Sequence, residues 1–410
     1  MALKEHLTAG EAAAQLGVSP ATLYAYVSRG LIRSEASPGA RRQRLYRRED
    51  IDMLNNRKEA RRNPTQAAER GLSWGLPVLE SGLTLISDGR LYYRGLDATH
   101  LAATRSVEEV ASLMWMGEIA PGCAELFARA AATIPGLAAM RVKLPELAPI
   151  ERFQVILALA EREDPGAYDF TPGTLVETGA RIVTLLAAIV APRNQSAGAI
   201  ARTLQSAWLP RDPGAQAVLS AALILLIDHE LAVSSFTARC VASASSTLYA
   251  VVAAGLCALR GVKHGGATER AEEFLREAAS ARKIREVVAS RLRRGELIPG
   301  FGHPLYPAGD PRARALLELL MRRYPHSPAI SLARSIMKEV RRVSDAMLPN
   351  IDLAVALLAR TLRLPEGSAI TIFALGRTIG WIGHALEQYR IDRLIRPRAR
   401  YVGPAPARQR

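Results

Sequence analysis

The chain has 410 residues, enough for two or three domains and a large buried core. Hydrophobic residues make up 49% of the sequence, which excludes an intrinsically disordered protein. The formal net charge of +15 favours anionic partners, namely nucleic acid, polyphosphate or carboxylate substrates, although an arginine-rich composition alone produces the same charge.

No stretch of the sequence predicts export or a membrane span. The beginning, "MALKEHLTAGEAAAQLG", lacks the apolar core of roughly 7–15 residues that a signal peptide needs. The apolar run at 174–192 carries Glu177 and Arg181, and the run at 217–230 is too short to cross a bilayer. The three cysteines have no metal-binding spacing, so we predict a cytoplasmic protein with buried thiols and no metal site.

The first 60 residues have the pattern of a helix-turn-helix. "TAGEAAAQLG" predicts a short helix that Thr8 caps, with Glu11 completing a capping box. "SPATLYAYVSRG" predicts a second helix that begins at the cap Ser19 and ends at Gly30. Two short helices joined by a tight turn form this motif, whose second helix contacts the bases and phosphates of DNA.

The second helix and the segment after it supply the candidate DNA contacts. A Ser-Pro-Gly turn at 37–39 lies beside arginines, as in a hairpin wing that contacts phosphates. The candidates are Thr22, Tyr24, Tyr26, Arg29, Arg41, Arg42 and Arg44. "LGVSPATLYAYVSRGLI" and "LYRREDIDML" resemble the winged helix-turn-helix of MerR-type regulators, which implies binding to duplex DNA. The alternative is a small helical docking module whose arginines are merely solvated.

Beyond this module the pattern is helical nearly throughout. "RKEARRNPTQAAERG" predicts a charged connecting helix or linker that ends near Gly71. In "SVEEVASLMWMG", Ser106 and Glu109 form a capping box ahead of apolar residues at helical spacing. A strand pattern is confined to "SGLTLISDGRLYYRG", a predicted hairpin that turns at 88–89. The sequence therefore predicts a mainly α protein with a minor β element.

Three of the seven histidines lie at helix ends beside glycine, proline or charged residues, namely His229, His264 and His303. In "GVKHGGATERAEEFL", His264 follows a buried helix that ends near Leu259. A Gly-Gly pair at 265–266 follows it and lets the backbone come close to a ligand. One such histidine is more often a core or capping residue. Three of them, followed by arginines and a carboxylate, indicate a functional site.

Residues 83–398 resemble the citrate synthase family. The motifs occur in the family's order: "DGRLYYRGLDATHLA", "SVEEVASLMWMGEI", "DHELAVSSFTARCVAS", "KHGGATERAEEFL", "GFGHPLYPAGDPRA", "PNIDLAVALL", "FALGRTIGWIGHALEQ" and "RPRARY". The resemblance implies a mainly helical, two-domain homodimer with its site in the cleft between the domains. We expect a winged helix-turn-helix module at 1–60, a linker at 61–75, a large domain at 76–264 and 363–410, and a small domain at 265–362.

The resemblance implies that acetyl-CoA condenses with oxaloacetate to give citrate and CoA, the first step of the tricarboxylic acid cycle. The coenzyme A thioester is a substrate, and no cofactor is implied. Asp352 would take the methyl proton, and His264 would donate to the thioester oxygen as the enol forms. His303 would hydrogen-bond the ketone oxygen and protonate it as the new carbon–carbon bond forms. Hydrolysis of the citryl thioester follows.

Oxaloacetate carries two carboxylates, which guanidinium groups bind through paired hydrogen bonds. The resemblance implies that His229, Arg312 and Arg377 hold this substrate, and that Arg396 reaches it from the partner subunit of a homodimer. Arg398 is the alternative to Arg396, two positions further along. Arg377 lies in an otherwise apolar helix, where a guanidinium is costly unless it is paired.

The chain departs from the family pattern in two places. Thr268 replaces a frequent asparagine, and Pro304 and Pro307 stand where a basic residue and Tyr-Lys are common. We expect these departures to affect the coenzyme A phosphate contacts and not the condensing residues. The alternative function is a metabolite-sensing, DNA-binding regulator with weak or no catalysis. Within the enzyme interpretation, 2-methylcitrate synthase is a second option.

Overall fold

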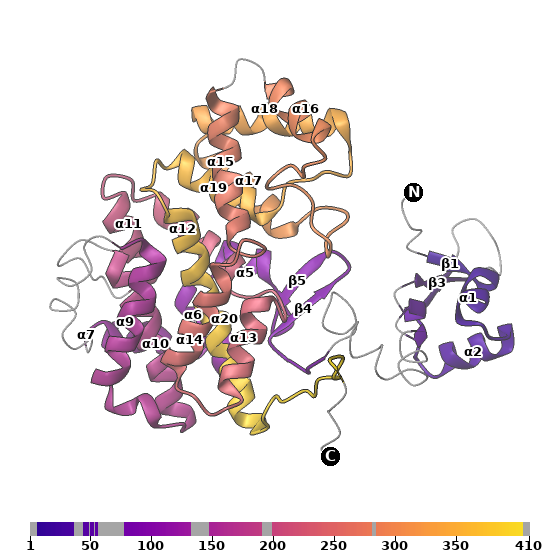
Figure 1. Ribbon diagram of the computed structural model, residues 1–410, viewed down its shortest axis with the longest axis horizontal. Coiled ribbons are helices and arrows are strands. Elements are labelled where there is room, and N and C mark those ends of the chain that lie inside the picture. The colour runs from indigo at the N-terminus through magenta and orange to yellow at the C-terminus, as the bar shows by residue number, and fades with distance from the viewer. Residues whose placement is uncertain are drawn as a thin grey trace. The chain divides into compact units, whose positions relative to one another are not determined.

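The computed structural model describes residues 6–36, 44–48, 50–52, 54–55, 78–132, 147–190, 199–280 and 284–404 (Figure 1). The chain divides into two compact units, Met1–Glu80 and Ser81–Arg410, each of which is described by itself. The turn predicted at 37–39, the candidates Arg41 and Arg42, and the linker predicted at 61–75 lie outside the described residues.

The first unit is a helix-turn-helix with a small sheet. Its helices are α1 (Ala9–Leu16) and α2 (Pro20–Ser28), and its strands are β1 (His6–Thr8), β2 (Ser34–Ala36) and β3 (Arg44–Arg47). β3 lies in the middle of the sheet and pairs antiparallel with both β1 and β2. The two predicted helices and the strand pairing of the predicted wing are confirmed.

The helix caps of the first unit form as the sequence predicts. The N–H of Glu11 donates to the Thr8 hydroxyl at 3.3 Å, and the N–H of Thr8 donates to the Glu11 carboxylate at 2.8 Å. Ser19 accepts from the N–H of Thr22 at 3.2 Å. Each cap satisfies backbone donors that a helix start leaves unpaired. The helices and the sheet enclose a small core of Leu7, Ala12, Ala13, Leu16, Leu23, Ile32, Tyr46 and Ile51.

The second unit opens with the predicted hairpin. Its strands are β4 (Thr84–Ser87), β5 (Arg90–Tyr93) and β6 (Leu96–Asp97), which pair antiparallel in that order. Asp88 and Gly89 form the turn with φ values of 52° and 69°. Positive φ at both central residues is the geometry of the two-residue hairpin turn that matches strand twist.

Most of the second unit is helical (Figure 1). The helices up to the Gly265–Gly266 pair are α5 (Ala98–Thr104), α6 (Val107–Met116), α7 (Cys123–Ala132), α9 (Pro149–Glu163), the 3-10 helix η1 (Pro165–Tyr168), α10 (Pro172–Val190), α11 (Ile200–Trp208), α12 (Ala215–Leu226), α13 (Val233–Ala242) and α14 (Leu248–Leu259). The later helices are α15 (Gly266–Ser280), α16 (Ile284–Arg293), α17 (Pro311–Arg323), α18 (Pro328–Val343), α19 (Ile351–Thr361) and α20 (Ser368–Ile391).

α20 is the central helix of this unit, since it is buried almost from end to end and packs against α6, α9, α10, α12, α13, α14, α15 and α19. The contact with α12 is close. A Cβ on Gly380 would lie 2.1 Å from the carbonyl oxygen of Ile227, which directly follows α12. Only glycine permits the two backbones to approach this closely.

α15 to α19 gather at one end of the second unit (Figure 1). α19 packs against α15, α17, α18 and α20, and α16 packs against α18. The long connection between α16 and α17 carries His303, and α19 begins directly before Asp352. This arrangement brings the segments around residues 264, 303, 312 and 352 close to one another.

Two helices, α10 and α20, are long and apolar enough to cross a membrane by length and composition alone. Their apolar windows are 67% and 100% buried inside the protein. Core helices of globular proteins pass the same test, and burial accounts for the apolar composition of both helices. The sequence excluded the α10 segment because of Glu177 and Arg181, and it did not single out α20.

The three cysteines differ in solvent exposure, although all were predicted to be buried. All three are free: Cys123 is buried, Cys240 is half-buried and Cys257 is exposed. The prediction of buried thiols therefore holds for Cys123 and is wrong for Cys257, which lies on the solvent side of α14.

Candidate active site

His264 lies in a tight turn between α14 and α15. The N–H of His264 donates to the Gly261 carbonyl at 2.8 Å, and the N–H of Gly265 donates to the Leu259 carbonyl at 2.9 Å. A Cβ on Gly265 would lie 2.4 Å from the Leu259 carbonyl oxygen. The sequence attributed this glycine to the close approach of a ligand. The structure gives another reason, because Gly265 closes the turn against the chain's own backbone.

The imidazole of His264 is held from both sides. Its Nε2 lies 2.8 Å from the Ser234 hydroxyl, and its ring meets the Phe373 ring edge-on with centroids 6.1 Å apart. Burial, and then the charge of Arg377, lower the pKa of His264 to about 4. The imidazole is therefore neutral near pH 7. If Ser234 donates to Nε2, the single proton of the ring is on Nδ1.

His229, His303 and Tyr306 form an aromatic cluster. The ring centroids lie 5.1 Å apart for His229 and His303, 5.5 Å for His229 and Tyr306, and 5.0 Å for His303 and Tyr306. The Tyr306 hydroxyl lies 3.0 Å from Nε2 of His229. The N–H of Leu305 donates to Nδ1 of His303 at 3.2 Å, so a neutral His303 carries its proton on Nε2.

The histidines of this cluster are neutral near pH 7. Burial, and then the charge of Arg312, lower the pKa of His303 to about 4. The same two causes, together with His303 itself, hold the pKa of His229 well below 6.5. A neutral imidazole can donate one hydrogen bond without adding a further positive charge to a site that already holds buried arginines.

The depressed histidine pKa values predict a stability that falls with acid. In the unfolded chain these histidines titrate near pH 6.5. Between about pH 6.5 and pH 4 the unfolded state therefore binds more protons than the folded state, and the free energy of unfolding falls as the pH is lowered. The histidines should lower the urea midpoint at pH 5 relative to pH 7, against the opposite contribution of Glu272, whose pKa burial raises to about 7. His303→Gln should reduce this difference. His326→Gln, at an exposed position, should leave it unchanged, and an equal effect of both would contradict the assignment.

Arg312 is buried and paired with Asp310. Nε of Arg312 donates to one carboxylate oxygen at 3.0 Å, and a terminal nitrogen donates to the other at 2.8 Å. Asp310 also accepts from the N–H of Arg312 and, at 3.0 Å, from the N–H of Ile351. One carboxylate thus caps the start of α17 and holds the start of α19. The guanidinium stacks over the Tyr306 ring at 5.5 Å.

Asp352 lies in the first turn of α19, where its carboxylate is half-buried. The Asn350 side chain caps this helix and accepts from the N–H of Asp352 at 3.1 Å. The Thr268 hydroxyl on α15 donates to Oδ1 of Asp352 at 2.7 Å. Burial raises the pKa of Asp352, against the lowering effects of the Thr268 hydrogen bond and of Arg312. The expectation that Thr268 bears only on coenzyme A contacts is wrong, because Thr268 contacts a predicted condensing residue directly.

Arg377 is buried, and no charged side chain among the described residues hydrogen-bonds to it. Only 2% of the residue is exposed, and its Nε donates to the Leu226 carbonyl at 2.9 Å. Its guanidinium lies over the Phe373 ring at 5.0 Å. Among the described residues, no acceptor bonds its Nη1. Burial lowers the pKa of Arg377. A buried donor with no partner is costly, and a carboxylate ligand would satisfy it.

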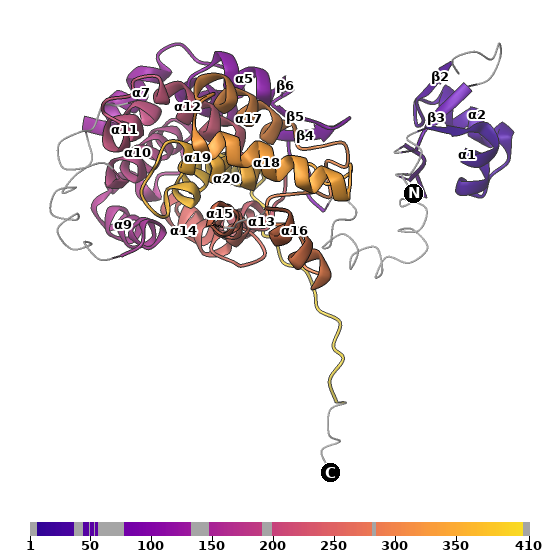
Figure 2. The ribbon, with the colours of Figure 1, turned by 90° about the horizontal axis from the view of Figure 1, so that it is seen from above.

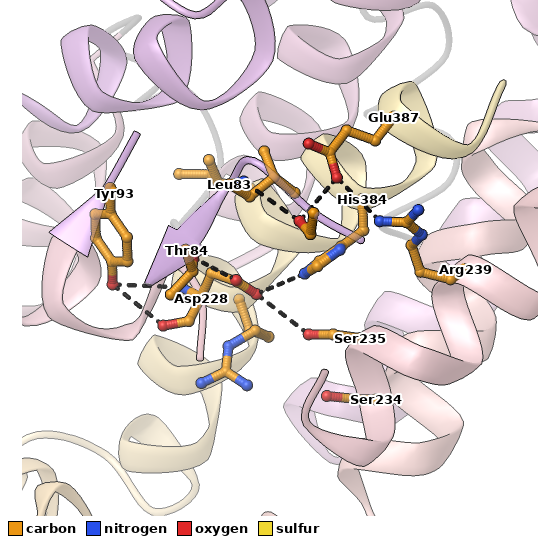
Figure 3. A network of polar contacts seen from close by, with 12 residues as sticks. Leu83, Thr84, Tyr93, Asp228, Ser234, Ser235, Arg239, His384 and Glu387 are labelled. Carbon is orange, nitrogen blue, oxygen red and sulfur yellow. Dashed lines mark hydrogen bonds and ion pairs between the residues drawn. The ribbon is translucent and has the colours of Figure 1, made fainter. Parts of the chain in front are cut away.

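Asp228, which directly precedes His229 in the sequence, is the centre of a network of polar contacts (Figure 3). Asp228 is fully buried and accepts from the Thr84 hydroxyl at 2.6 Å and from the Ser235 hydroxyl at 3.2 Å. Nε2 of His384 lies 3.1 Å from the same carboxylate, and the Tyr93 hydroxyl contacts the Asp228 backbone. This network ties the segment that ends in His229 to β4, β5, α13 and α20.

Sequence reasoning missed several of these residues. The quoted motifs contain Asp228, Ser234, Tyr306, Asp310 and His384, but the sequence analysis gave none of them a role. The available signals were weak. Asp228 follows an apolar run directly, and Tyr306 is an aromatic residue three positions after a candidate histidine.

Arg396 does not join the other predicted residues within the described chain. It is exposed in the segment after α20, which extends away from the helices (Figure 2). Arg398 is exposed in the same segment. The neighbouring residue Ile395 is held by a hydrogen bond, which its N–H donates to the Ser243 hydroxyl at 3.1 Å. The assignment of Arg396 to a partner's site stays a prediction.

The candidate DNA contacts differ in exposure. Tyr24 is exposed on α2, Arg29 is exposed directly after this helix, and Arg44 is exposed at the start of β3. Thr22 is half-buried, and its hydroxyl and N–H both contact the cap Ser19. Tyr26 is half-buried and packs against the small core. The exposed residues are therefore better placed for a ligand than Thr22 or Tyr26. Across the whole described chain, no cluster of three or more His, Cys, Asp or Glu could hold a metal ion.

Comparison with known proteins agrees with this geometry. The family model "Citrate synthase, C-terminal domain" matches residues 71–398, and "MerR HTH family regulatory protein" matches residues 7–63. Citrate synthase 2 of Bacillus subtilis is 32% identical over 82% of this chain and 96% of that protein. A 2-methylcitrate synthase of Shewanella oneidensis is 28% identical over 83% and 96%.

Solved structures give the same result. Citrate synthase from Thermotoga maritima superimposes with a TM-score of 0.70 at 28% identity, covering 82% of this chain and 96% of that one. The ternary complex of Thermoplasma acidophilum citrate synthase with carboxymethyl coenzyme A and oxaloacetate shares the fold at a TM-score of 0.73 and 24% identity, over 83% and 97%. The fold and site define an acyl-transferring enzyme of the citrate synthase type. The chain belongs to the citrate synthase family and carries a MerR-type helix-turn-helix domain at its N-terminus.

Proposed function

We propose that this protein condenses acetyl-CoA with oxaloacetate and releases citrate and CoA. The observation that carries the proposal is the buried guanidinium of Arg377, whose Nη1 has no acceptor among the described residues. It belongs to a site with two neutral histidines and a carboxylate of raised pKa. A dicarboxylate substrate and an enolisable thioester together use all of these groups.

In the proposed first step, Asp352 takes a proton from the methyl group of acetyl-CoA. The raised pKa makes its carboxylate a better base than an exposed aspartate. His264 donates the Nδ1 proton to the thioester oxygen as the enol forms, and takes it back when carbon–carbon bonding restores the thioester carbonyl. This tautomer requires that the Ser234 hydroxyl donates to Nε2, which the 2.8 Å contact permits, and the low pKa of His264 supports a neutral donor.

In the proposed second step, the enol carbon attacks the ketone carbon of oxaloacetate. His303 hydrogen-bonds the ketone oxygen and supplies the proton from Nε2 as the alkoxide forms, which agrees with the acceptor role of Nδ1 toward Leu305. Arg312 and Arg377 bind the two carboxylates, together with His229 and with Arg396 of the partner subunit. Water then hydrolyses the citryl thioester.

The proposed architecture is a cytoplasmic homodimer. Residues 265–362 form the small domain, and residues 76–264 and 363–410 form the large domain. The grouping of α15 to α19 supports the small domain (Figure 1). The exposed segment that carries Arg396 supports the homodimer, and the free cysteines support the cytoplasmic location. Free cysteines fit a reducing compartment.

The acyl group of the thioester substrate is acetyl or propionyl, since relatives include both citrate synthases and a 2-methylcitrate synthase. One methylene changes binding by only about 1–3 kcal/mol. The test is a CoA-release assay with oxaloacetate and either acetyl-CoA or propionyl-CoA. We expect the higher kcat/KM with acetyl-CoA. A preference for propionyl-CoA would favour 2-methylcitrate synthase. No release with either thioester would favour the alternative, a metabolite-sensing DNA-binding regulator, which the N-terminal MerR-type domain supports.

We further propose that the N-terminal domain binds duplex DNA. Exposed Arg29 and Arg44 support a phosphate-binding surface, and Arg41 and Arg42 add charge in the sequence. The full-length protein should bind duplex DNA with an affinity that falls steeply with salt, because arginines release counterions from phosphates. Changing Arg41, Arg42 and Arg44 to glutamine should weaken binding and flatten the salt slope by roughly 0.9 for each phosphate that is no longer neutralised.

The control for this prediction changes three exposed arginines of the second unit, namely Arg276, Arg341 and Arg342. It removes the same formal charge from a different part of the chain. Equal weakening in both triple variants would indicate a non-specific charge effect. Absence of binding at low salt would support a protein-docking module instead.

A further inference from the structure

Thr268 links the two parts of the site that act on the thioester. It lies in the first turn of α15, one helical turn after His264, and it is fully buried. The Ala267 N–H donates to the His264 carbonyl at 2.9 Å, and the Thr268 N–H donates to the Gly265 carbonyl at 3.0 Å. The start of α15 is therefore bonded to the turn that carries His264, and Thr268 extends this connection to Asp352.

The hydroxyl of Thr268 and the carboxylate of Asp352 come from different helices. Thr268 Oγ1 donates to Oδ1 at 2.7 Å, and α15 packs along α19. Asn350 holds only the backbone of Asp352, so it fixes the helix start and not the rotation of the carboxylate. Among the described residues, no other hydrogen bond holds Oδ1 or Oδ2. The Thr268 hydroxyl is thus the contact that sets the plane of the carboxylate.

We propose that Thr268 is a positioning residue that holds Oδ1 of Asp352 and thereby presents Oδ2 to the methyl group of the acyl-CoA substrate. This inference rests on the proposed function. It explains how threonine serves at a position where the family frequently has asparagine, because a hydroxyl and an amide N–H both donate to a carboxylate. A hydrogen bond to a charged group also restricts its motion, which a proton transfer requires.

The same hydrogen bond affects the basicity of Asp352. Burial raises the pKa of this carboxylate, and the Thr268 bond is the largest of the effects that lower it. The charged groups that act on Asp352 are Arg312 and Asp310 at the start of α17, Arg270 on α15 and Arg377 on α20. Loss of the hydroxyl alone leaves these charges in place. It therefore shifts the pKa of Asp352 further upward, and the acid limb of the kcat profile moves to higher pH.

The test compares Thr268→Val, which keeps the shape without the hydroxyl, with Thr268→Ser, which keeps the hydroxyl. We expect Thr268→Val to lower kcat by roughly 10–100-fold, since small misplacements of reacting groups have effects of this size. The acid limb should move upward, and the isotope effect with trideuterated acetyl-CoA should increase as proton removal becomes slower. The oxaloacetate Kd measured by calorimetry should not change, and Thr268→Ser should restore most of the activity.

A second pair covers the case in which Thr268→Val does not fold. Thr268→Ala and Thr268→Ser differ by one hydroxyl, so the same contrast in kcat, acid limb and isotope effect is expected between them. An active wild type with no such contrast in either pair would overturn the positioning role and leave the proposed function intact. A wild type that releases no CoA from any acyl-CoA would overturn the proposed function, and the positioning role with it.

Discussion

Replacement of Asp352 by asparagine is expected to lower kcat by roughly 10²–10⁴-fold, the usual contribution of a general base, and to leave oxaloacetate affinity unchanged. The amide keeps the shape of the side chain, and its oxygen can still accept from Thr268. Only the ability to take the methyl proton is lost. CoA release under saturating substrates gives kcat, and calorimetry gives the Kd for oxaloacetate.

The matched control is Asp345→Asn, because the Asp345 side chain is 91% exposed in the same stretch of the chain. It should retain wild-type kcat and stability. Near-normal turnover by the Asp352→Asn variant would show that another group removes the proton. A parallel loss of oxaloacetate binding would show instead that Asp352 supports the structure of the cleft.

Arg312 and Arg377 are expected to differ in what they contribute to stability, although both are proposed to bind the same substrate. Arg312→Met leaves the Asp310 carboxylate buried and unpaired, and breaking a buried pair in this way costs about 3–5 kcal/mol. Among the described residues, the Nε hydrogen bond of Arg377 goes to a backbone carbonyl, and Asp228 acts on it only through its charge, so Arg377→Met should destabilise the unliganded protein less than Arg312→Met.

Arg377 should instead contribute to stability when oxaloacetate is bound. Its loss is expected to weaken oxaloacetate binding by roughly 10–150-fold, which corresponds to about 1.5–3 kcal/mol for a hydrogen bond to a charged group. Wild-type protein at 100 times Kd gains about 2.7 kcal/mol of stability from the ligand, and Arg377→Met at the same concentration should lose about 1.3–2.4 kcal/mol of this gain. Urea unfolding with and without oxaloacetate measures both effects. Equal destabilisation of the two unliganded variants would contradict the distinction.

Local features were predictable from the sequence because their causes are local. The capping boxes at Thr8 and Ser106 and the hairpin turn at Asp88 depend on residues within a few positions of each other, and all three form as predicted. The predicted site residues other than Arg396 lie near one another in the second unit. The resemblance of several motifs in order identified these residues, since a single histidine at a helix end is more often a core or capping residue.

The residues that support the cleft were not predictable in this way. The Thr268 hydroxyl and Asp352 are 84 positions apart, and His384 and Asp228 are 156 positions apart. Helix packing decides these pairings, and the period of a hydrophobic pattern does not reveal which helices become neighbours. The role of Thr268 was also not evident from residue types. Threonine differs from the family's frequent asparagine, but both side chains can donate a hydrogen bond to a carboxylate.

The close contact of Gly380 with the Ile227 carbonyl constrains how this gene can change over evolutionary time. A single-residue insertion or deletion within α20 would rotate everything beyond it by about 100° and shift it by about 1.5 Å. Such a change upstream of Arg377 would turn this residue, Gly380 and His384 away from their partners together. We therefore expect α20 to diverge by substitution at fixed length.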